Sequence, residues 1–373
     1  MARSRLLALT AALVGALSLA AIGPAEVSGA RCPQWTGAPP PNPGSSDDGL
    51  EGVAVLGPCS VWAVGSSEDG GQNNVLVQHW NGSRWRTAPT PTPGSNDVLF
   101  DVSPSWAVGF TGAQTLALRR VGTSWGQVAT PNPSATSNNL QGVVQLSSKN
   151  AWAVGSYQGP SAVRTLVLHW NGSHWKRIAS PNVGGDSTGN ALTGIAAASA
   201  RDIWAVGYYG TVSGDLPLVL HWNGKRWKVV TSPAAGQAPF GATLSGVGAS
   251  SADRAWAAGS YYDGTQLKAL VLRWNGAKWK RVKPLGLGAA ASVLEDVLAL
   301  SDRNVWIVGE DSPNNLVLHW NGRNWKKVAV GNPGTLENIF RGIDASSKGE
   351  IWAVGAARDT GPTPYYTQAQ HCC

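Results

Sequence analysis

The sequence contains few sulfur atoms and little charge. Its 373 residues include one methionine and four cysteines, and charged residues make up only 14%. No two cysteines form a Cys-x-x-Cys motif, the usual signature of a structural metal site or a redox pair. From these absences we predict neither a metal site nor a cofactor.

Long apolar runs are missing from most of the chain. The one clear run, residues 6–21, follows Arg3 and Arg5 and precedes the small residues Ser28-Gly29-Ala30. This order is typical of an export signal, and the run is short for a membrane-spanning helix. We therefore predict a signal peptide at residues 1–30 and a propeller domain at residues 31–373. The mature protein is expected to be secreted, extracellular or associated with the cell wall, without a membrane span.

The composition favours a folded chain over a disordered one. Apolar residues make up 43% of the sequence, and 46 glycines and 19 tryptophans are present. This apolar content is enough for a substantial core. The formal net charge of +7 is modest for a chain of this length, so we predict no nucleic-acid partner.

A repeated pattern runs along the chain. Before each copy of a Trp-Ala-Val-Gly-like segment comes the pattern Leu/Phe-x-Gly/Asp-Val/Ile. After most copies comes a hairpin such as residues 166–175, in which an Asn-Gly pair predicts a tight turn. The seven segments begin at Trp62, Trp106, Trp152, Trp204, Trp256, Trp306 and Trp352. All 19 tryptophans fall into three columns of this repeat.

The seventh copy is divided between the two ends of the chain. Its last strand is missing after Cys373, whereas Trp35 and the residues after it match the return strand that begins at Trp175 in another copy. If the two ends are joined, Cys372 and Trp35 have the same spacing as the equivalent pairs elsewhere. We therefore predict an all-β, seven-bladed β-propeller with four strands per blade, closed by the N-terminal strand completing the last blade.

These repeats resemble two groups of known propellers. The Trp-Ala-Val-Gly strands and the His-Trp-Asn-Gly-x-x-Trp hairpins, such as residues 169–175, resemble those of secreted bacterial β-propeller repeat proteins grouped with kelch and galactose-oxidase-like proteins. The Asn-Gly-x-x-Trp turn is also similar to the Asp-box hairpin of sialidase-type propellers, with asparagine in place of aspartate. The resemblance implies the fold over residues 32–373, but propellers host many unrelated activities. Copper chemistry is not expected, because no cysteine has the tyrosine neighbour that such a centre needs.

The repeat also predicts how the cysteines pair. Cys373 and Cys32 fall at neighbouring positions of the divided hairpin, so we predict a disulfide between them, with Cys372 as the alternative partner of Cys32. Cys59 lies in a turn on the same face of the propeller. We therefore predict Cys59 and Cys372 as a second pair.

Residues that recur in every copy are expected to serve packing. Five of the six histidines share one column, in which Arg119 and Arg273 stand in the other two copies. Lysines and arginines cluster on the fourth strand, for example Lys228 and Lys280. Charge on this outer strand discourages edge-to-edge pairing. The alternative is a basic rim that binds an anionic polymer.

A binding site is expected where the repeat varies, in the loops between the second and third strands. Tyr157, Tyr209 and Tyr261 occupy the same position in consecutive copies, which predicts an arc on one face. The other predicted ligand-binding residues are Tyr208, Tyr262 and Asp263. Aromatic rings beside carboxylates suit sugars, and the same set suits a protein partner. The alternative is that these tyrosines only pack the loops down.

Taken together, the sequence predicts a secreted, monomeric binding protein. Its predicted ligand is an extracellular carbohydrate or cell-envelope polymer, and an interaction scaffold for an extracellular protein is the alternative. A third alternative is a glycoside hydrolase or lyase, because two loop carboxylates would meet the requirement of such catalysis. The sequence does not indicate which acids would meet, so we predict no catalytic residue.

Overall fold

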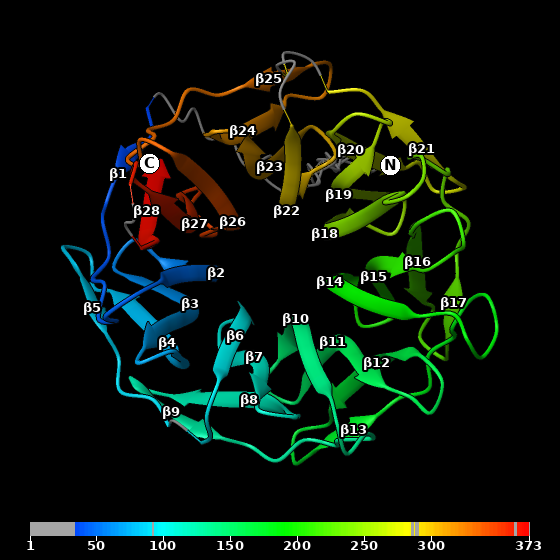
Figure 1. The fold of residues 1–373 in the computed structure, drawn as a ribbon, viewed down its shortest axis with the longest axis horizontal. Coiled ribbons are helices and arrows are strands. Elements are labelled where there is room, and N and C mark those ends of the chain that lie inside the picture. Colours follow the sequence, from blue (N-terminus) through cyan, green and yellow to red (C-terminus); the bar gives the residue numbers. More distant parts are fainter. Residues whose placement is uncertain (1–33, 92, 285–286, 288–290, 362–363, 373) are drawn as a thin grey trace, which may run out of the picture.

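Short apolar strands and tight turns dominate the chain, and in the computed structural model they close into a ring (Figure 1). The structure describes residues 34–373 apart from 92, 285–286, 288–290, 362–363 and 373. Seven four-stranded antiparallel sheets, the blades, surround a central channel. Every regular element of the described residues is a strand, so the predicted seven-bladed propeller is confirmed.

The blades are numbered in chain order, and each is given from its innermost to its outermost strand. Blade one has β2 (Asp48–Gly57), β3 (Ser60–Asp69), β4 (Gln72–Trp80) and β5 (Trp85–Thr87). Blade two has β6 (Asp97–Val102), β7 (Trp106–Thr111), β8 (Gln114–Val121) and β9 (Ser124–Gln127). Blade three has β10 (Asn138–Ser147), β11 (Asn150–Gln158), β12 (Val163–Trp170) and β13 (Trp175–Arg177).

The remaining blades follow the same order. Blade four has β14 (Asn190–Ser199), β15 (Asp202–Tyr209), β16 (Leu216–Trp222) and β17 (Trp227–Val229). Blade five has β18 (Ala242–Ser251), β19 (Arg254–Tyr262), β20 (Leu267–Trp274) and β21 (Trp279–Val282). Blade six has β22 (Ser292–Ser301), β23 (Asn304–Asp311), β24 (Asn314–Trp320) and β25 (Trp325–Lys327). Blade seven has β26 (Glu337–Ala345), β27 (Ile351–Arg358), β28 (Tyr366–Cys372) and β1 (Thr36–Gly37).

The first strand of the chain completes the last blade. In β1, Thr36 pairs with His371 and Gly37 with Gln370, and the Ala38 amide donates to the Ala369 carbonyl at 2.9 Å. Trp35, just before β1, is buried against Trp306 of blade six with ring centroids 6.2 Å apart. The predicted closure by the N-terminal strand is therefore confirmed.

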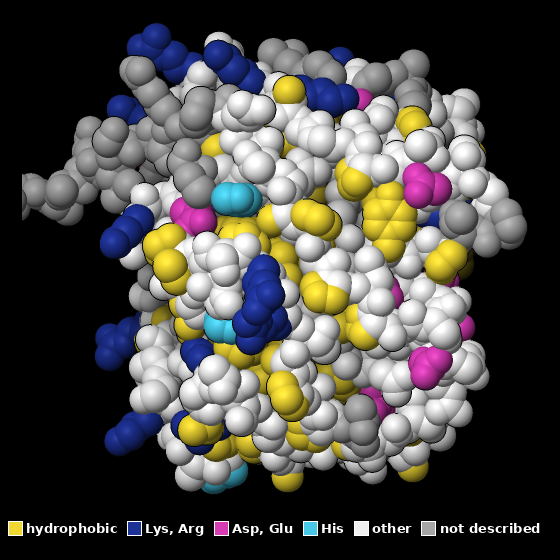
Figure 2. Space-filling view, turned by 90° about the vertical axis from the view of Figure 1, so that its left-hand side faces the viewer, with side chains coloured by type: hydrophobic (Ala, Val, Ile, Leu, Met, Phe, Trp, Pro, Cys, Tyr) yellow, Lys and Arg dark blue, Asp and Glu magenta, His cyan; other side chains and the backbone are white. Residues whose placement is uncertain are grey.

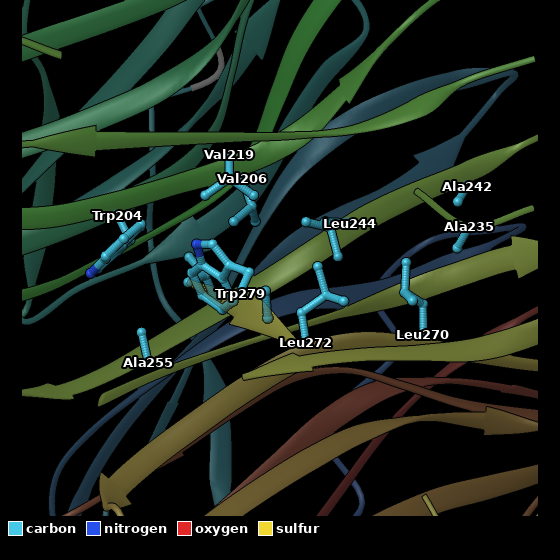
Figure 3. Packing of buried hydrophobic residues seen from close by; sticks show 12 residues of the cluster. Trp204, Val206, Val219, Ala235, Ala242, Leu244, Ala255, Leu270, Leu272 and Trp279 are labelled. Atoms are coloured by element: carbon cyan, nitrogen blue, oxygen red, sulfur yellow. The ribbon is translucent and has the colours of Figure 1, made fainter. Parts of the chain in front are cut away.

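Buried tryptophans join neighbouring blades. The tryptophan at the start of each fourth strand, or one residue from it, packs against the Trp-Ala-Val-Gly tryptophan of the preceding blade. Trp279, for example, meets Trp204 edge-on, with centroids 5.1 Å apart and planes at 89° (Figure 3). Leu244 and Leu272 extend the same apolar cluster between blades four and five. The equivalent pairs elsewhere are Trp85–Trp352, Trp125–Trp62, Trp175–Trp106, Trp227–Trp152 and Trp325–Trp256.

The histidine column packs on these tryptophans within each blade. His371 stacks on Trp352 with centroids 4.4 Å apart and planes at 12°, whereas the Arg273 guanidinium lies 5.0 Å from the Trp256 ring instead. His221 Nε2 also lies 2.7 Å from an Asp202 carboxylate oxygen. A packing and hydrogen-bonding role for this column is therefore confirmed.

The cysteines differ in part from the prediction. Cys59 is exposed and free, which rules out its predicted pairing with Cys372. Its side chain covers Gly82 in the Asn-Gly turn of its own blade. In other blades Lys149 covers Gly172 and Arg201 covers Gly224 in the same way. Cys372 is buried and disulfide-bonded. Cys32 and Cys373 lie outside the described residues, so the partner of Cys372 is not described, and the pairing of Cys32 with Cys373, or with Cys372 as the alternative, stays a prediction.

The described residues contain neither a candidate membrane-spanning helix nor a candidate metal cluster. No helix among them is long and apolar enough to cross a bilayer. Nor do three or more His, Cys, Asp or Glu side chains group, within that part of the chain, as a metal ion would require.

Candidate funnel site on the loop face

The two faces of the disc have different contents. One face, which we call the loop face, carries the loops between second and third strands and the connections between blades. The other, the turn face, carries the short turns between first and second strands and between third and fourth strands. Strand pairing places the start of each innermost strand at the loop face. In blade three, for example, Asn138 pairs with Tyr157 near the end of β11.

Each innermost strand contains a β-bulge at the same position in its first half, and five of the seven strands have a second register shift close to the following turn. In β10 the pairing skips Gln141, because Leu140 pairs with Gly155 and Gly142 with Val154. The same shift occurs in all seven blades. A bulge re-aims a side chain, and bulges are frequent next to active sites.

The seven bulge residues form a ring in the wall of the central channel. Their residues, from blade one to blade seven, are Glu51, Phe100, Gln141, Thr193, Ser245, Glu295 and Arg341, and all line one cavity of about 480 Å³. No two neighbouring blades supply the same residue. We call this set the funnel ring.

The repeat itself creates these bulges. The glycine of each Trp-Ala-Val-Gly segment lies against the bulge backbone, where a Cβ on Gly207 would come within 2.1 Å of the Ala191 carbonyl oxygen. The Gly/Asp position after each bulge brings the next blade equally close, since a Cβ on Gly246 would lie 2.7 Å from the Asp296 Cα. The close backbone contacts are therefore made by the residues around each bulge residue, and the bulge residue itself can differ from blade to blade.

Charge gathers on one side of the ring. Arg341 lies between blades six and one, and its Nη1 donates to Glu51 Oε1 at 2.5 Å. Arg341 also interacts electrostatically with Glu295, while its own Nε is buried without a hydrogen-bond partner among the described residues. The carboxylates of Glu295 and of the nearby Glu310 of β23 have no hydrogen bond or ion pair in the described part of the chain.

A second set of polar contacts borders the charged side. The Tyr365 hydroxyl donates to Glu337 Oε2 at 2.5 Å, and Arg358 Nη2 lies 3.3 Å from the same oxygen. Arg358 also covers the Tyr365 ring, 4.6 Å from its centroid. Glu337 is thereby satisfied by its own neighbours, in contrast to Glu295 and Glu310.

Burial sets the protonation of the ring acids. It raises the pKa of Glu295 to about 7, with Arg341 opposing the rise and Glu51 and Glu310 adding to it. Burial likewise raises the pKa of Glu51 and of Glu310. The Glu295 carboxyl therefore changes charge around neutral pH.

Three aspartates in the channel wall have a structural role. Asp101, for example, accepts hydrogen bonds from its neighbour Val102 at 2.7 Å and from Val143 of the next blade at 2.8 Å. Asp296 and Asp344 reach the next blade in the same way. Burial raises the pKa of Asp101 to about 8, that of Asp344 to about 7 and that of Asp296 to about 6.

The predicted tyrosine arc is at equivalent positions, but its rings are partly covered. The Arg177 guanidinium lies 4.6 Å from the Tyr157 ring centroid and donates to its hydroxyl at 2.6 Å. The Arg281 guanidinium likewise lies over the Tyr261 ring, 4.0 Å from its centroid. Tyr209 packs against the apolar cluster between blades three and four. These contacts fit the alternative in which the tyrosines pack the loops.

Of the other predicted residues, Tyr262 and Asp263 line two separate outer cavities, and Tyr208 lines neither of them. Tyr262 lines a cavity of about 530 Å³ with Asp215, Gln266 and Phe240, and its ring meets Phe240 edge-on at 5.1 Å. Tyr208 is half-buried, and burial together with the Asp215 charge raises its pKa.

Asp263 and Tyr261 line a neighbouring cavity of about 830 Å³. The Asp263 carboxylate closes its own turn by accepting from Thr265 and Gln266, and these hydrogen bonds lower its pKa to about 2. Asp263 Oδ1 therefore already accepts hydrogen bonds from its own loop.

The funnel ring was missed in the sequence, although a signal was present. The ring residues are the x of the Leu/Phe-x-Gly/Asp-Val/Ile pattern, the one variable position inside a repeated strand. We predicted variation in the loops, whereas this variation lies on the innermost strands. The direction of a bulged side chain is not readable from the pattern alone.

Comparison with known proteins supports the fold. The sequence matches no protein-family model and no curated protein. The solved structure of "YCF48 bound to D1 peptide" is 12% identical, with coverage of 91% of this chain and 97% of that one and a TM-score of 0.58. The RRP9 WD40 repeats are 12% identical, with coverage of 92% and 98% and a TM-score of 0.58.

A third similar structure is the extracellular domain of the putative hybrid two-component system BT4673 from B. thetaiotaomicron. It is 10% identical, and the match covers 90% of this chain and 39% of that one, with a TM-score of 0.54. At such identities these neighbours, WD40 repeats among them, show the propeller fold alone.

Proposed function

We propose that this protein is a binding scaffold whose loop face takes a polypeptide segment, with a lysine or arginine side chain of that segment entering the funnel ring. The observation that carries the proposal is the ring itself. Seven equivalent side chains differ from one another on a scaffold that otherwise repeats, and all point into one cavity. Variation confined to a cavity wall is what ligand recognition requires and what blade packing does not.

The charges of the ring favour a cationic group. Glu51 is paired with Arg341, which leaves the Glu295 and Glu310 carboxylates without a hydrogen-bonding partner among the described residues. An ammonium or guanidinium group would satisfy both. The uncharged side of the ring, with Gln141, Thr193 and Ser245, offers hydrogen bonds to a peptide backbone.

A fold neighbour is consistent with this proposal. The similar structure named above is described as bound to a peptide. A propeller face with loops and blade connections is also a common place for recognition, because loops carry function on a rigid scaffold.

A random peptide library displayed on phage tests the proposal. We expect the selected peptides to be enriched in lysine or arginine. We expect the combined change Glu51→Gln, Glu295→Gln and Glu310→Gln to weaken their binding at least roughly tenfold. The matched control changes three acids elsewhere on the loop face, Glu68→Gln, Asp69→Asn and Asp186→Asn, and should leave binding within about twofold. Peptides without cationic enrichment, or equal losses in both variants, would refute the proposal.

A carbohydrate or cell-envelope polymer is the second candidate, and it has an observation of its own. Phe240 is 62% exposed beside Tyr262 in the cavity that also contains Asp215 and Gln266. An exposed aromatic ring next to a carboxylate and an amide suits a sugar. Binding on a glycan array that Phe240→Ala abolishes and the funnel variant leaves unchanged would favour this candidate. Its extracellular location stays part of the proposal, and fractionation of the native host would check it.

A further inference from the structure

Cations collect on the turn face. The turns between first and second strands and between third and fourth strands contain nine exposed lysines and arginines. They are Arg84, Lys149, Arg201, Lys225, Arg226, Lys278, Arg303, Arg323 and Lys348. In the described turns only Asp253 and Asp302 face solvent with the opposite charge, because Glu350 is buried. Six of the seven blades contribute to this set, which we call the turn cations.

A second row of cations follows directly behind the turns. The residue after the fourth-strand tryptophan is Arg86, Lys176, Lys228, Lys280 or Lys326 in five of the blades, and each is exposed. All five lie on the outermost strand. The repeat thus adds five positive charges behind the nine turn cations.

The opposite face carries a group of acidic side chains, together with cations such as Arg177 and Arg281. Glu68, Asp69, Asp186, Asp215 and Asp359 lie in or beside the loops of the loop face. Figure 2 shows the disc edge-on from the side of blades seven and one, with most lysine and arginine toward one face and most aspartate and glutamate toward the other. The net charge of +7 is therefore distributed unevenly, with more positive charge on the turn face and more negative charge on the loop face.

The turn cations surround the disc. They extend from turns that all lie on the same face of the ring of blades, and these turns are spread around the ring (Figure 1) instead of along one stripe. A linear polyanion would contact only the blades along its path. A flat anionic surface would contact all of them together, and each lysine or arginine near such a surface contributes separately to binding.

Apolar side chains accompany these cations. Val121 is 75% exposed at the end of β8, and Leu56 and Leu300 are 38% and 39% exposed at the ends of β2 and β22. All three lie at the turn face. Cations combined with exposed apolar residues are typical of proteins that lie on a membrane surface.

From this complementarity we infer that the turn face docks on an anionic lipid membrane. The protein would lie flat, with its loop face and funnel ring directed away from the lipid. Docking would be peripheral and reversible, and it does not depend on the ligand proposed for the funnel.

Co-sedimentation with vesicles tests this inference. Large unilamellar vesicles of phosphatidylcholine with 30% phosphatidylglycerol are compared with pure phosphatidylcholine vesicles. We expect binding only to the first, and a loss of at least tenfold between about 50 mM and 500 mM salt because the attraction is screened. The combined change Arg201→Glu, Lys225→Glu and Lys278→Glu should weaken binding at least roughly thirtyfold.

The matched control reverses three charges at the other end of the outer strands, Arg177→Glu, Arg281→Glu and Lys283→Glu. Net charge changes equally, so a loss in this variant as large as in the turn variant would overturn the inference. Thermal unfolding followed by circular dichroism would confirm that both variants fold. Binding to heparin without binding to the phosphatidylglycerol vesicles would also overturn it, in favour of a linear polyanion.

Discussion

At the scale of single residues, four consecutive positions of the repeat divide into those that pack the blades together and one that faces the proposed binding site. In the pattern Leu/Phe-x-Gly/Asp-Val/Ile, the first residue is buried in every blade, and the last is buried in all blades except blade four, where Ile195 is partly buried. The third position brings the next blade close, and the second is the bulge that points into the channel. Thr193 shows the transition, because it lines the channel and also donates to the Leu244 carbonyl of the next blade at 2.7 Å.

The glycine opposite each bulge is expected to be irreplaceable. In Gly207→Ala the new methyl would lie 2.1 Å from the Ala191 carbonyl oxygen, so the two innermost strands must separate. We expect a loss of about 3 kcal/mol or more in the free energy of unfolding, measured by urea denaturation. Gly126→Ala is the control, since nothing lies within 4 Å of the new methyl, and it should change stability by less than about 0.5 kcal/mol.

The channel aspartates make stability depend on pH. Burial raises the pKa of folded Asp101 to about 8, well above the unfolded value of about 4. The folded state therefore binds more protons, so this contribution is complete below pH 4 and is lost as pH rises through 8. We expect the protein to unfold more easily at pH 8.5 than at pH 5.5.

Asp101→Asn should reduce this pH dependence by at least about 1 kcal/mol. Urea denaturation at the two pH values measures it. The variant is expected to be less stable than the natural chain at low pH, so the slope and not the absolute value is the result that matters. An unchanged slope would show that Asp101 does not hold the proton.

Ligand binding at the funnel should depend on pH in the opposite direction. Burial raises the pKa of Glu295 to about 7, so this carboxyl gains its charge between pH 6 and pH 8. Affinity for a cationic peptide selected as above should therefore rise about threefold or more over this range. Titration calorimetry at both pH values measures the rise, and Glu295→Gln should abolish it. A rise that persists in Glu295→Gln would assign the titration to another group.

At the scale of elements, the tryptophan contacts explain why the blades were predictable. The tryptophans of the third and fourth strands both pack against the Trp-Ala-Val-Gly tryptophan of the preceding blade, so the repeat in sequence is also the repeat in packing. The four strands, the Asn-Gly turns and the charged outer strand all followed from it. The funnel ring did not, because it depends on how seven non-equivalent side chains meet in space. The free state of Cys59 was not predictable from the repeat either, because its position is fixed by a contact with Gly82 that recurs at the equivalent glycines of other blades.

Removal of one such contact should destabilise two blades together. Trp279→Ala would leave a cavity against Trp204 and the cluster that contains Leu272. We expect a loss of about 3–5 kcal/mol, and a smaller one for Trp279→Phe, by thermal or urea unfolding. Val229→Ala, at a position 47% exposed on the neighbouring outer strand, should be nearly neutral. Equal effects of Trp279→Ala and Val229→Ala would contradict the interlocking of blades.

At the scale of the whole molecule, closure fixes the geometry on which both proposed surfaces depend. The funnel ring requires all seven blades around one channel, and the turn cations require their turns on one face. Both are held by two residues of β1 and by the Trp35 contact with blade six. The division of the seventh repeat between the two ends made this closure predictable from the sequence. Which surfaces the closed ring presents for binding was not.

Native-state hydrogen exchange at Ala38 tests closure most directly. Its amide donates to Ala369 across the junction between the first and last strands, at 2.9 Å. If the ring is closed as described, this amide should exchange at least about a hundredfold more slowly than in an unstructured chain. Exchange at the unstructured rate, with the amides of the other blades still protected, would show that the N-terminal strand does not complete the seventh blade.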